Sequence, residues 1–232
     1  MLSQCETDFN IDRHLISFLQ DSPFYAELSR HIHKVPTLDI PTAAVTFVEK
    51  TDELTLFWNP YFFGGGEYTD KSGKSHKYNK LSDSEIRGVL LHEYNHLVFG
   101  HLYGRRRSPP DLWNIATDLA INSLIVTAAN NDSGRRNDER ALPEFCLIPG
   151  VFPKDISGRE FTSAEKKSMK LGQIIANLPT MQASEWYFEK VKEELQDEEQ
   201  SSGAGTCGEG QIGSMDDRSE ERRVGKECRS RW

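Results

Sequence analysis

The chain has 232 residues, which allows one domain of ordinary size followed by a tail. Apolar residues make up 37% of the sequence and charged residues 28%, and the net charge of −8 disfavours binding to the phosphate backbone of nucleic acids. The N-terminal residues lack the basic and apolar regions of a signal peptide, and no apolar run is long enough to span a membrane. We therefore expect neither a nucleic-acid partner nor a membrane partner.

The N-terminal part of the chain has the pattern of paired helices. Residues 11–33 carry apolar side chains at the spacing of one or two helices. Within them, Asp21-Ser22-Pro23 is a stop-and-restart signal. It predicts Ser22 as an N-cap and Pro23 in the first turn of a second helix.

The next part of the chain is typical of β-structure. In residues 43–60, two segments with alternating apolar side chains flank a polar turn at residues 50–53. The second segment, at residues 54–58, is either part of a core hairpin or an edge strand beside the following helix, where an extended peptide could pair with it. Residues 61–78 are polar and rich in glycine, so we expect an open loop there.

An H-E-x-x-H motif, His92-Glu93-Tyr94-Asn95-His96, lies in an apolar segment. Residues four apart lie on one face of a helix, so His92 and His96 can direct their imidazoles at one divalent metal ion, most often zinc. Glu93 could then act as general base on a metal-bound water. Ser82 and Glu85 form a capping box that places the helix start just after Ser82. A chance match on an amphipathic helix is the alternative, and the apolar flanks favour the metal site.

A catalytic zinc takes three protein ligands and leaves one position for water. The helix predicted over residues 111–126 carries a polar stripe of Asn114, Asp118 and Asn122, which can face the two histidines across a short connection. We favour Asp118 as the third ligand, with both asparagines orienting it. His101 is the alternative third ligand, provided that the helix ends at Gly100 and the chain turns back. Otherwise His101 would support the site by hydrogen bonding.

The segments H-E-Y-N-H-L-V-F-G-H-L, W-N-I-A-T-D-L-A-I-N and L-F-W-N-P-Y-F-F resemble the DUF2201-type metallopeptidases of bacteria and phages over residues 45–126. The resemblance implies an α+β, zincin-like metallopeptidase domain, rich in helix, with a small β-sheet or hairpin before the H-E-x-x-H helix. It further implies Zn²⁺, a peptide or protein substrate and an AAA-type ATPase partner. A von Willebrand A-like domain often follows in that family, and its Asp-x-Ser-x-Ser metal site does not occur in this sequence.

The C-terminal part predicts helices at residues 163–178 and 183–195, after an irregular apolar strap at residues 142–153. We expect a metallopeptidase domain over residues 1–197 and a Gly-, Ser- and acid-rich linker over residues 198–217.

The last fifteen residues, 218–232, resemble the translation of a sequencing adapter along their whole length, and we expect them to be non-native rather than a basic binding tail. Their six basic and three acidic residues leave 22 basic and 33 acidic residues in the preceding chain, a net charge of −11. The tail also contains one of the four cysteines. The other three are widely separated and lack a C-x-x-C pair, which suits a reducing cytoplasm.

Two functions from different classes follow from these features. The first is a zinc-dependent metallopeptidase, a hydrolase in which Glu93 is the general base. The second is a catalytically silent, metal-stabilised scaffold that works with a missing von Willebrand A-like domain. Glu93 favours the enzyme, because a structural metal site does not need this carboxylate.

Overall fold

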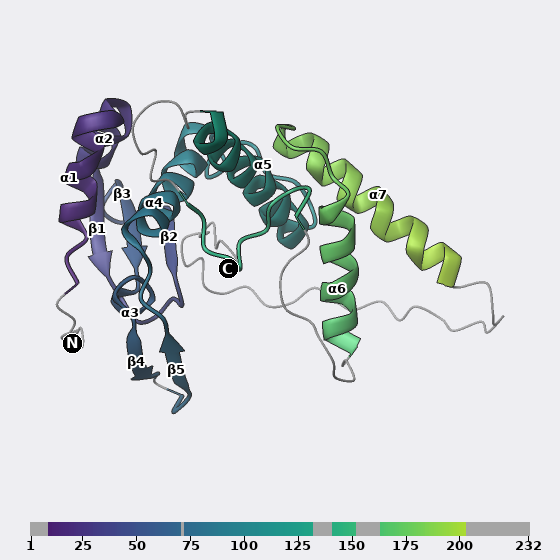
Figure 1. The fold of residues 1–232 in the computed structure, drawn as a ribbon, viewed down its shortest axis with the longest axis horizontal. Helices are drawn as coiled ribbons and strands as arrows, with labels where there is room; N and C mark the ends of the chain where they lie inside the picture. Colours follow the sequence, from purple (N-terminus) through teal and green to yellow (C-terminus); the bar gives the residue numbers. More distant parts are fainter. Residues whose placement is uncertain (1–8, 71, 132–140, 152–162, 203–232) are drawn as a thin grey trace.

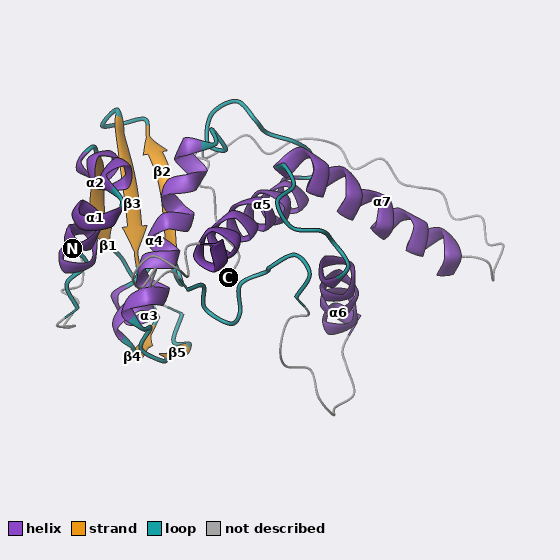
Figure 2. Ribbon diagram, turned by 45° about the horizontal axis from the view of Figure 1, so that its top comes forward, coloured by secondary structure: helices purple, strands orange, loops and turns teal. Residues whose placement is uncertain are grey.

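The computed structural model describes residues 9–70, 72–131, 141–151 and 163–202, and these form an α+β fold of helices and two small sheets (Figures 1 and 2). The elements in chain order are α1 (Asp12–Asp21), α2 (Pro23–Arg30), β1 (Ile32–Pro36), β2 (Ala43–Val48), β3 (Glu53–Trp58), α3 (Pro60–Gly64), β4 (Gly66–Thr69), β5 (Ser75–Tyr78), α4 (Asp83–Val98), α5 (Pro110–Asn131), α6 (Ser163–Ala176) and α7 (Ser184–Ser202). No helix in these ranges is long and apolar enough to cross a membrane. The expected linker begins within α7, and its remainder and the expected adapter-derived tail lie outside the described residues.

The larger sheet has the strand order β1-β3-β2, with β3 parallel to β1 and antiparallel to β2. The β2–β3 hairpin confirms the prediction from alternating apolar residues. Strand β1 was missed, because residues 32 and 33 were assigned to the preceding helix. The helix stops at Arg30, and Pro36 forces the residue before it into extended backbone, which favours a strand.

The predicted break between the first two helices is confirmed, with Pro23 in the first turn of α2. Its capping was only partly right, because the Ser22 side chain makes no capping hydrogen bond. The fixed φ of proline and its missing N–H suit the first helical position, so Pro23 itself is sufficient to restart the helix.

The open loop expected over residues 61–78 is wrong, because this segment forms α3 and the β4–β5 hairpin. Helix α3 starts where the Asn59 side chain accepts a hydrogen bond from the Tyr61 backbone N–H. In the hairpin turn, Asp70 Oδ1 accepts from the backbone N–H groups of Ser72 and Lys74. This hairpin is stabilised by hydrogen bonds in its turn and by stacking of Tyr68 on Tyr78. It lacks the alternating apolar residues by which strands are predicted from sequence.

Helix α4 begins with the predicted capping box between Ser82 and Glu85 and is buried from Ile86 to His96. It packs against β2 on one side and α5 on the other. The start of the apolar strap also contacts it at Gly88, where an added Cβ would lie 3.5 Å from the Leu142 side chain and only 2.0 Å from the backbone oxygen of the preceding residue, Ala141. The absence of a side chain at Gly88 therefore allows the strap to touch the helix.

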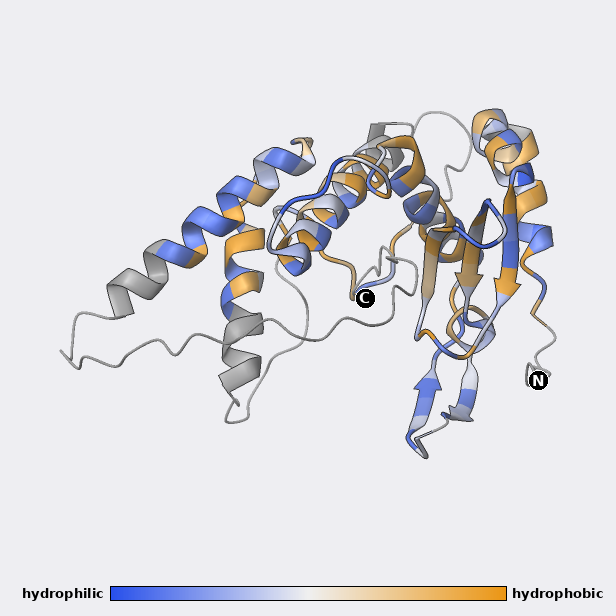
Figure 3. Cartoon of the chain, turned by 180° about the vertical axis from the view of Figure 1, so that it is seen from behind, coloured by the Kyte–Doolittle hydropathy of each residue, from blue (hydrophilic) through white to orange (hydrophobic). Residues whose placement is uncertain are grey.

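The buried apolar side chains form two clusters, and α5 contributes to both. Ile121 and Ile125 belong to the cluster that includes the larger sheet and α4. Leu112 and Leu119 lie roughly 120–180° around the helix from these two residues, and they belong to the cluster with α6 and α7. Figure 1 shows α6 and α7 on the far side of α5 from the sheet, and Figure 3 shows hydrophobic residues on the strands of the larger sheet and on the helices beside it.

Candidate metal centre

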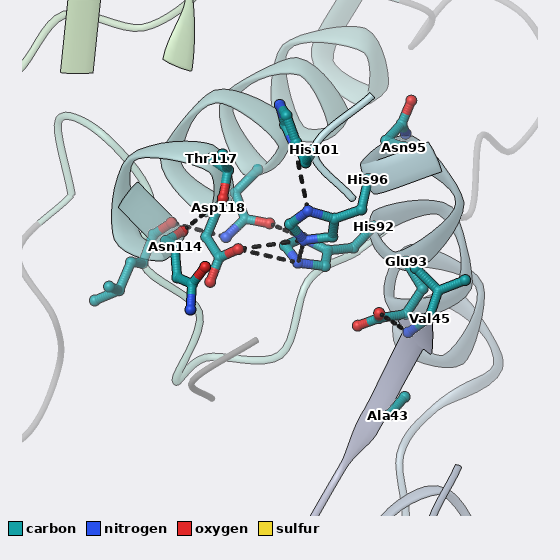
Figure 4. Close-up of polar contacts among 12 residues, drawn as sticks. Ala43, Val45, His92, Glu93, Asn95, His96, His101, Asn114, Thr117 and Asp118 are labelled. Atoms are coloured by element: carbon teal, nitrogen blue, oxygen red, sulfur yellow. Dashed lines mark hydrogen bonds and ion pairs between the residues drawn. The ribbon is translucent and has the colours of Figure 1, made fainter. Parts of the chain in front are cut away.

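Three side chains that sequence analysis selected as metal ligands lie together between α4 and α5 (Figure 4). The Nε2 atoms of His92 and His96 are 3.0 Å apart. Asp118 Oδ1 is 3.3 Å from His96 Nε2 and 3.6 Å from His92 Nε2. The histidines are 0% exposed and Asp118 is 6% exposed. This buried triad could hold a metal ion, and it is the only such cluster in the part of the chain that the structure describes.

The His92 ring is held with its Nε2 lone pair directed at the centre. Its Nδ1 lies 2.7 Å from Asn122 Oδ1, and the amide nitrogen of Asn122 donates to the Leu147 backbone oxygen at 2.9 Å. Because the amide nitrogen faces a carbonyl, the amide oxygen faces His92 and must accept from an Nδ1–H. A neutral His92 then has no proton on Nε2, which is the form that binds a metal. Asn122 thus orients His92, and not Asp118 as predicted.

His101 reaches the centre by the chain reversal that sequence analysis had named as a condition. Gly100 has a φ of +68°, and the His101 N–H donates to the His96 carbonyl at 3.0 Å. However, His101 Nδ1 lies 3.2 Å from Nδ1 of His96, across the ring from the His96 Nε2 atom that faces Asp118. His101 therefore contacts the far side of the His96 ring, and Asp118 is the third member of the cluster that could hold a metal ion.

Burial, reinforced by the charges of His96 and Arg105, lowers the pKa of His101 to about 3. His101 is therefore neutral at pH 7, with one nitrogen that donates and one that accepts. Its Nε2 lies 3.2 Å from the hydroxyl of Ser184, the first residue of α7. A chain of contacts thus runs from His96 through His101 to Ser184.

The Oδ1 atom of Asp118 faces the two histidines without a hydrogen-bond donor of its own. This oxygen is fully buried and makes no hydrogen bond, although it lies within ion-pair distance of both rings. Burial alone raises the pKa of Asp118, but contacts with His92 and His96 outweigh it and lower that pKa, so the carboxylate is ionised. An anionic oxygen and an imidazole lone pair at one buried point fit a cation, which would satisfy both.

Glu93 follows the first histidine and is 0% exposed. Its Oε2 accepts a hydrogen bond from the Val45 backbone N–H at 3.1 Å, and Figure 4 shows this contact with β2 beside the histidines. Strand β2 is an edge strand of the sheet, so its outward N–H groups have no partner strand. Of the two alternatives for residues 54–58, the core hairpin is confirmed and the edge strand is wrong, because these residues lie in the central strand β3 and β2 is the edge beside α4.

The remaining predicted residue, Asn114, lies on α5 one turn before Asp118. Its backbone oxygen accepts from the Thr117 hydroxyl, and its side chain makes no hydrogen bond within the described ranges. Sequence analysis missed Val45 and Ser184. Both meet the site through contacts between residues far apart in the chain, and neither belongs to a pattern that would have identified it.

Helix α7 packs on α5 through a buried apolar cluster and makes two ion pairs with the α4–α5 connection. Arg105 contacts Glu185, and Arg107 contacts Glu189 at 2.6 Å. The Arg107 guanidinium also lies 5.9 Å from the centre of the Trp113 ring. These contacts hold the first turns of α7, including Ser184, next to the candidate metal centre.

Comparison with known proteins identifies no relative. No family model, no curated protein and no solved structure matches the chain. The interpretation of the site therefore depends on the arrangement and chemistry of His92, His96, Asp118 and Glu93.

Proposed function

We propose that this chain is a zinc-dependent metallopeptidase with a zincin-like domain. The observation that supports the proposal most strongly is the convergence of His92, His96 and Asp118, whose ligand atoms all lie within 4.8 Å of one another, with Glu93 next to the first ligand. Two imidazoles and one carboxylate form a ligand set found in catalytic zinc sites. The resemblance of residues 45–126 to the DUF2201-type metallopeptidases agrees with this assignment.

Each residue has a distinct role in the proposed reaction. His92, His96 and Asp118 would hold the ion, which supplies Lewis acidity and lowers the pKa of a bound water. Glu93 would take a proton from the attacking water and return it to the leaving amine. The Val45 N–H donates to Glu93 Oε2, which restricts the orientation of the carboxylate.

The burial of the site supports a second candidate, a metal-stabilised scaffold without catalysis. His92, Glu93 and His96 are all 0% exposed. A structural metal site is typically closed to solvent, whereas a hydrolase must admit its substrate. In this second function the metal would stabilise the contact between α4 and α5, and Glu93 would serve only to cap the edge of β2.

The two candidates are separated by comparing zinc binding with hydrolysis in the full chain. We would measure bound zinc per chain and cleavage of labelled casein for the wild type, His96→Ala, Glu93→Gln and the exposed control Glu67→Gln. The peptidase proposal expects Glu93→Gln to keep its zinc and lose about 10²–10⁴-fold in cleavage rate. It expects Glu67→Gln to match the wild type in both measurements.

Each other outcome has a defined meaning. Zinc bound by the wild type and lost in His96→Ala, with no cleavage above the metal-free control, supports the scaffold. Equal cleavage by the wild type and Glu93→Gln excludes Glu93 as the base. A folded wild type that takes up no zinc excludes both candidates.

A further inference from the structure

We infer that Ser184 is a positioning residue of the metal centre, acting through His101 on His96. By accepting a hydrogen bond from His101, the Ser184 hydroxyl allows His96 to adopt the tautomer that binds a metal ion. The inference rests on the proposed function for the existence of the metal site. It goes further by stating that the first residue of α7 affects the metal affinity of that site.

The geometry supplies a continuous path. His96 Nε2 faces Asp118 at 3.3 Å, and its other nitrogen, Nδ1, lies 3.2 Å from His101 Nδ1. His101 Nε2 lies 3.2 Å from Ser184 Oγ. All of these side chains are buried, with Ser184 5% exposed and His101 4% exposed. Buried polar groups need partners within the protein, so the three side chains determine one another's proton positions.

Only one of the two proton arrangements along this path is compatible with a metal ion. When His96 Nε2 is a ligand, the His96 proton is on Nδ1 and is donated to His101 Nδ1. The His101 proton is then on Nε2 and is donated to the Ser184 oxygen. In the opposite arrangement His101 donates to His96 Nδ1, which leaves a proton on His96 Nε2 and blocks coordination. A hydroxyl can accept, so Ser184 satisfies the arrangement that binds metal.

An alanine at position 184 would favour the wrong arrangement. It would leave the His101 Nε2–H buried without an acceptor in the metal-binding arrangement, and the His101 Nε2 lone pair without a donor in the opposite one. A buried donor without a partner is tolerated less than a buried acceptor without one, so the metal-binding arrangement loses more. Helix α7 keeps the hydroxyl in place, because Tyr187 and Phe188 in its first turns are buried in the cluster with α5. The start of α7 therefore belongs to the metal centre, although it contributes no ligand.

The test measures metal binding by the full chain. We would determine the Kd for Zn²⁺ and the visible absorption spectrum of the Co²⁺ complex for the wild type, Ser184→Ala, Ser184→Thr and Ser29→Ala. Ser29 is the matched control, since its buried hydroxyl accepts from Tyr94 at 3.1 Å on another side of α4. Urea unfolding of the metal-free proteins would show how much stability each alanine removes.

We expect Ser184→Ala to weaken Zn²⁺ binding about 10–100-fold, as loss of a hydrogen-bond partner behind a histidine ligand typically does, and to change the Co²⁺ spectrum. Ser184→Thr keeps a hydroxyl and should restore both readouts, while Ser29→Ala should lose stability but bind as the wild type does. The inference is overturned if Ser184→Ala binds with the wild-type Kd, if threonine fails to restore binding, or if Ser29→Ala weakens binding equally. A folded wild type that binds neither ion instead overturns the proposed function.

Discussion

Replacing Asn122 by alanine should weaken metal binding and destabilise the fold together. The amide is 1% exposed and joins two groups, the His92 ring at 2.7 Å and the Leu147 backbone oxygen at 2.9 Å. Its removal takes the acceptor from the buried His92 Nδ1–H and the donor from the partly buried Leu147 oxygen. The His92 ring is then free to rotate or to move its proton to Nε2, the nitrogen that the metal requires.

The magnitude of each effect follows from these two contacts. A buried polar group left without a hydrogen bond costs about 1–3 kcal/mol, and the Leu147 oxygen is only partly buried, so the free energy of unfolding should fall by roughly 1–3 kcal/mol. A water molecule that enters the vacated volume would bring the loss to the lower end of this range. Loss of a hydrogen-bond partner to a ligand histidine weakens metal affinity about 10–100-fold, or roughly 1.4–2.7 kcal/mol.

Two measurements test this reasoning on the same samples. Urea denaturation of the metal-free protein gives the free energy of unfolding, and competition with a zinc chelator gives the Kd for Zn²⁺. Asn114→Ala is the matched control, because it removes the same side chain two turns earlier on α5, where that side chain makes no hydrogen bond among the described residues. Wild-type zinc affinity in Asn122→Ala, or equal losses in both variants, would refute the role assigned to this amide.

Three further predictions concern stability. Gly88→Ala should lose about 1–3 kcal/mol or more in urea unfolding, because its Cβ would lie 2.0 Å from the Ala141 oxygen, whereas Gly104→Ala, where nothing lies within 4 Å, should match the wild type. At pH 7, Tyr187→Phe should be about 1 kcal/mol less stable than the wild type, because it lacks the hydrogen bond to Pro179. Burial raises the pKa of Tyr187, so the wild type should lose stability as the pH rises above 10, and the variant, which has no phenol to ionise, should lose less. Equal alkaline losses in free energy of unfolding would contradict this. Zn²⁺ at 100 times its Kd should raise the Tm by about 5–10 °C, and Asp118→Ala should abolish this shift in a thermal melt.

The features that were predictable from sequence are those set by local spacing. His92 and His96 meet because they are four residues apart on one helix, and Ser82 with Glu85 marks its start, so both could be read from the sequence. The position of Asp118 in the site was predictable from the sequence for a different reason. Asp118 is a polar residue on an otherwise apolar helix that follows soon after the motif.

The features that were missed depend on contacts between distant residues or on polar chemistry. Ser184 meets His101 only because α7 packs against the α4–α5 connection, which no local pattern encodes. Strand β1 is stabilised by parallel pairing with β3, and such pairing leaves no turn signal in the sequence. The β4–β5 hairpin has polar strands, so the apolar alternation used to find strands does not occur there.

The position of α5 in both hydrophobic clusters determines how the protein should lose its structure. Ile121 and Ile125 pack with the sheet, and Leu112 and Leu119 pack with α6 and α7, while the candidate ligands lie where α5 faces α4. A metal ion there would cross-link the two helices and make unfolding of the clusters one cooperative event. Removal of the ion should separate this event into two transitions. Native-state hydrogen exchange should then give one free energy of opening for the cluster with the sheet and another for the cluster with α6 and α7.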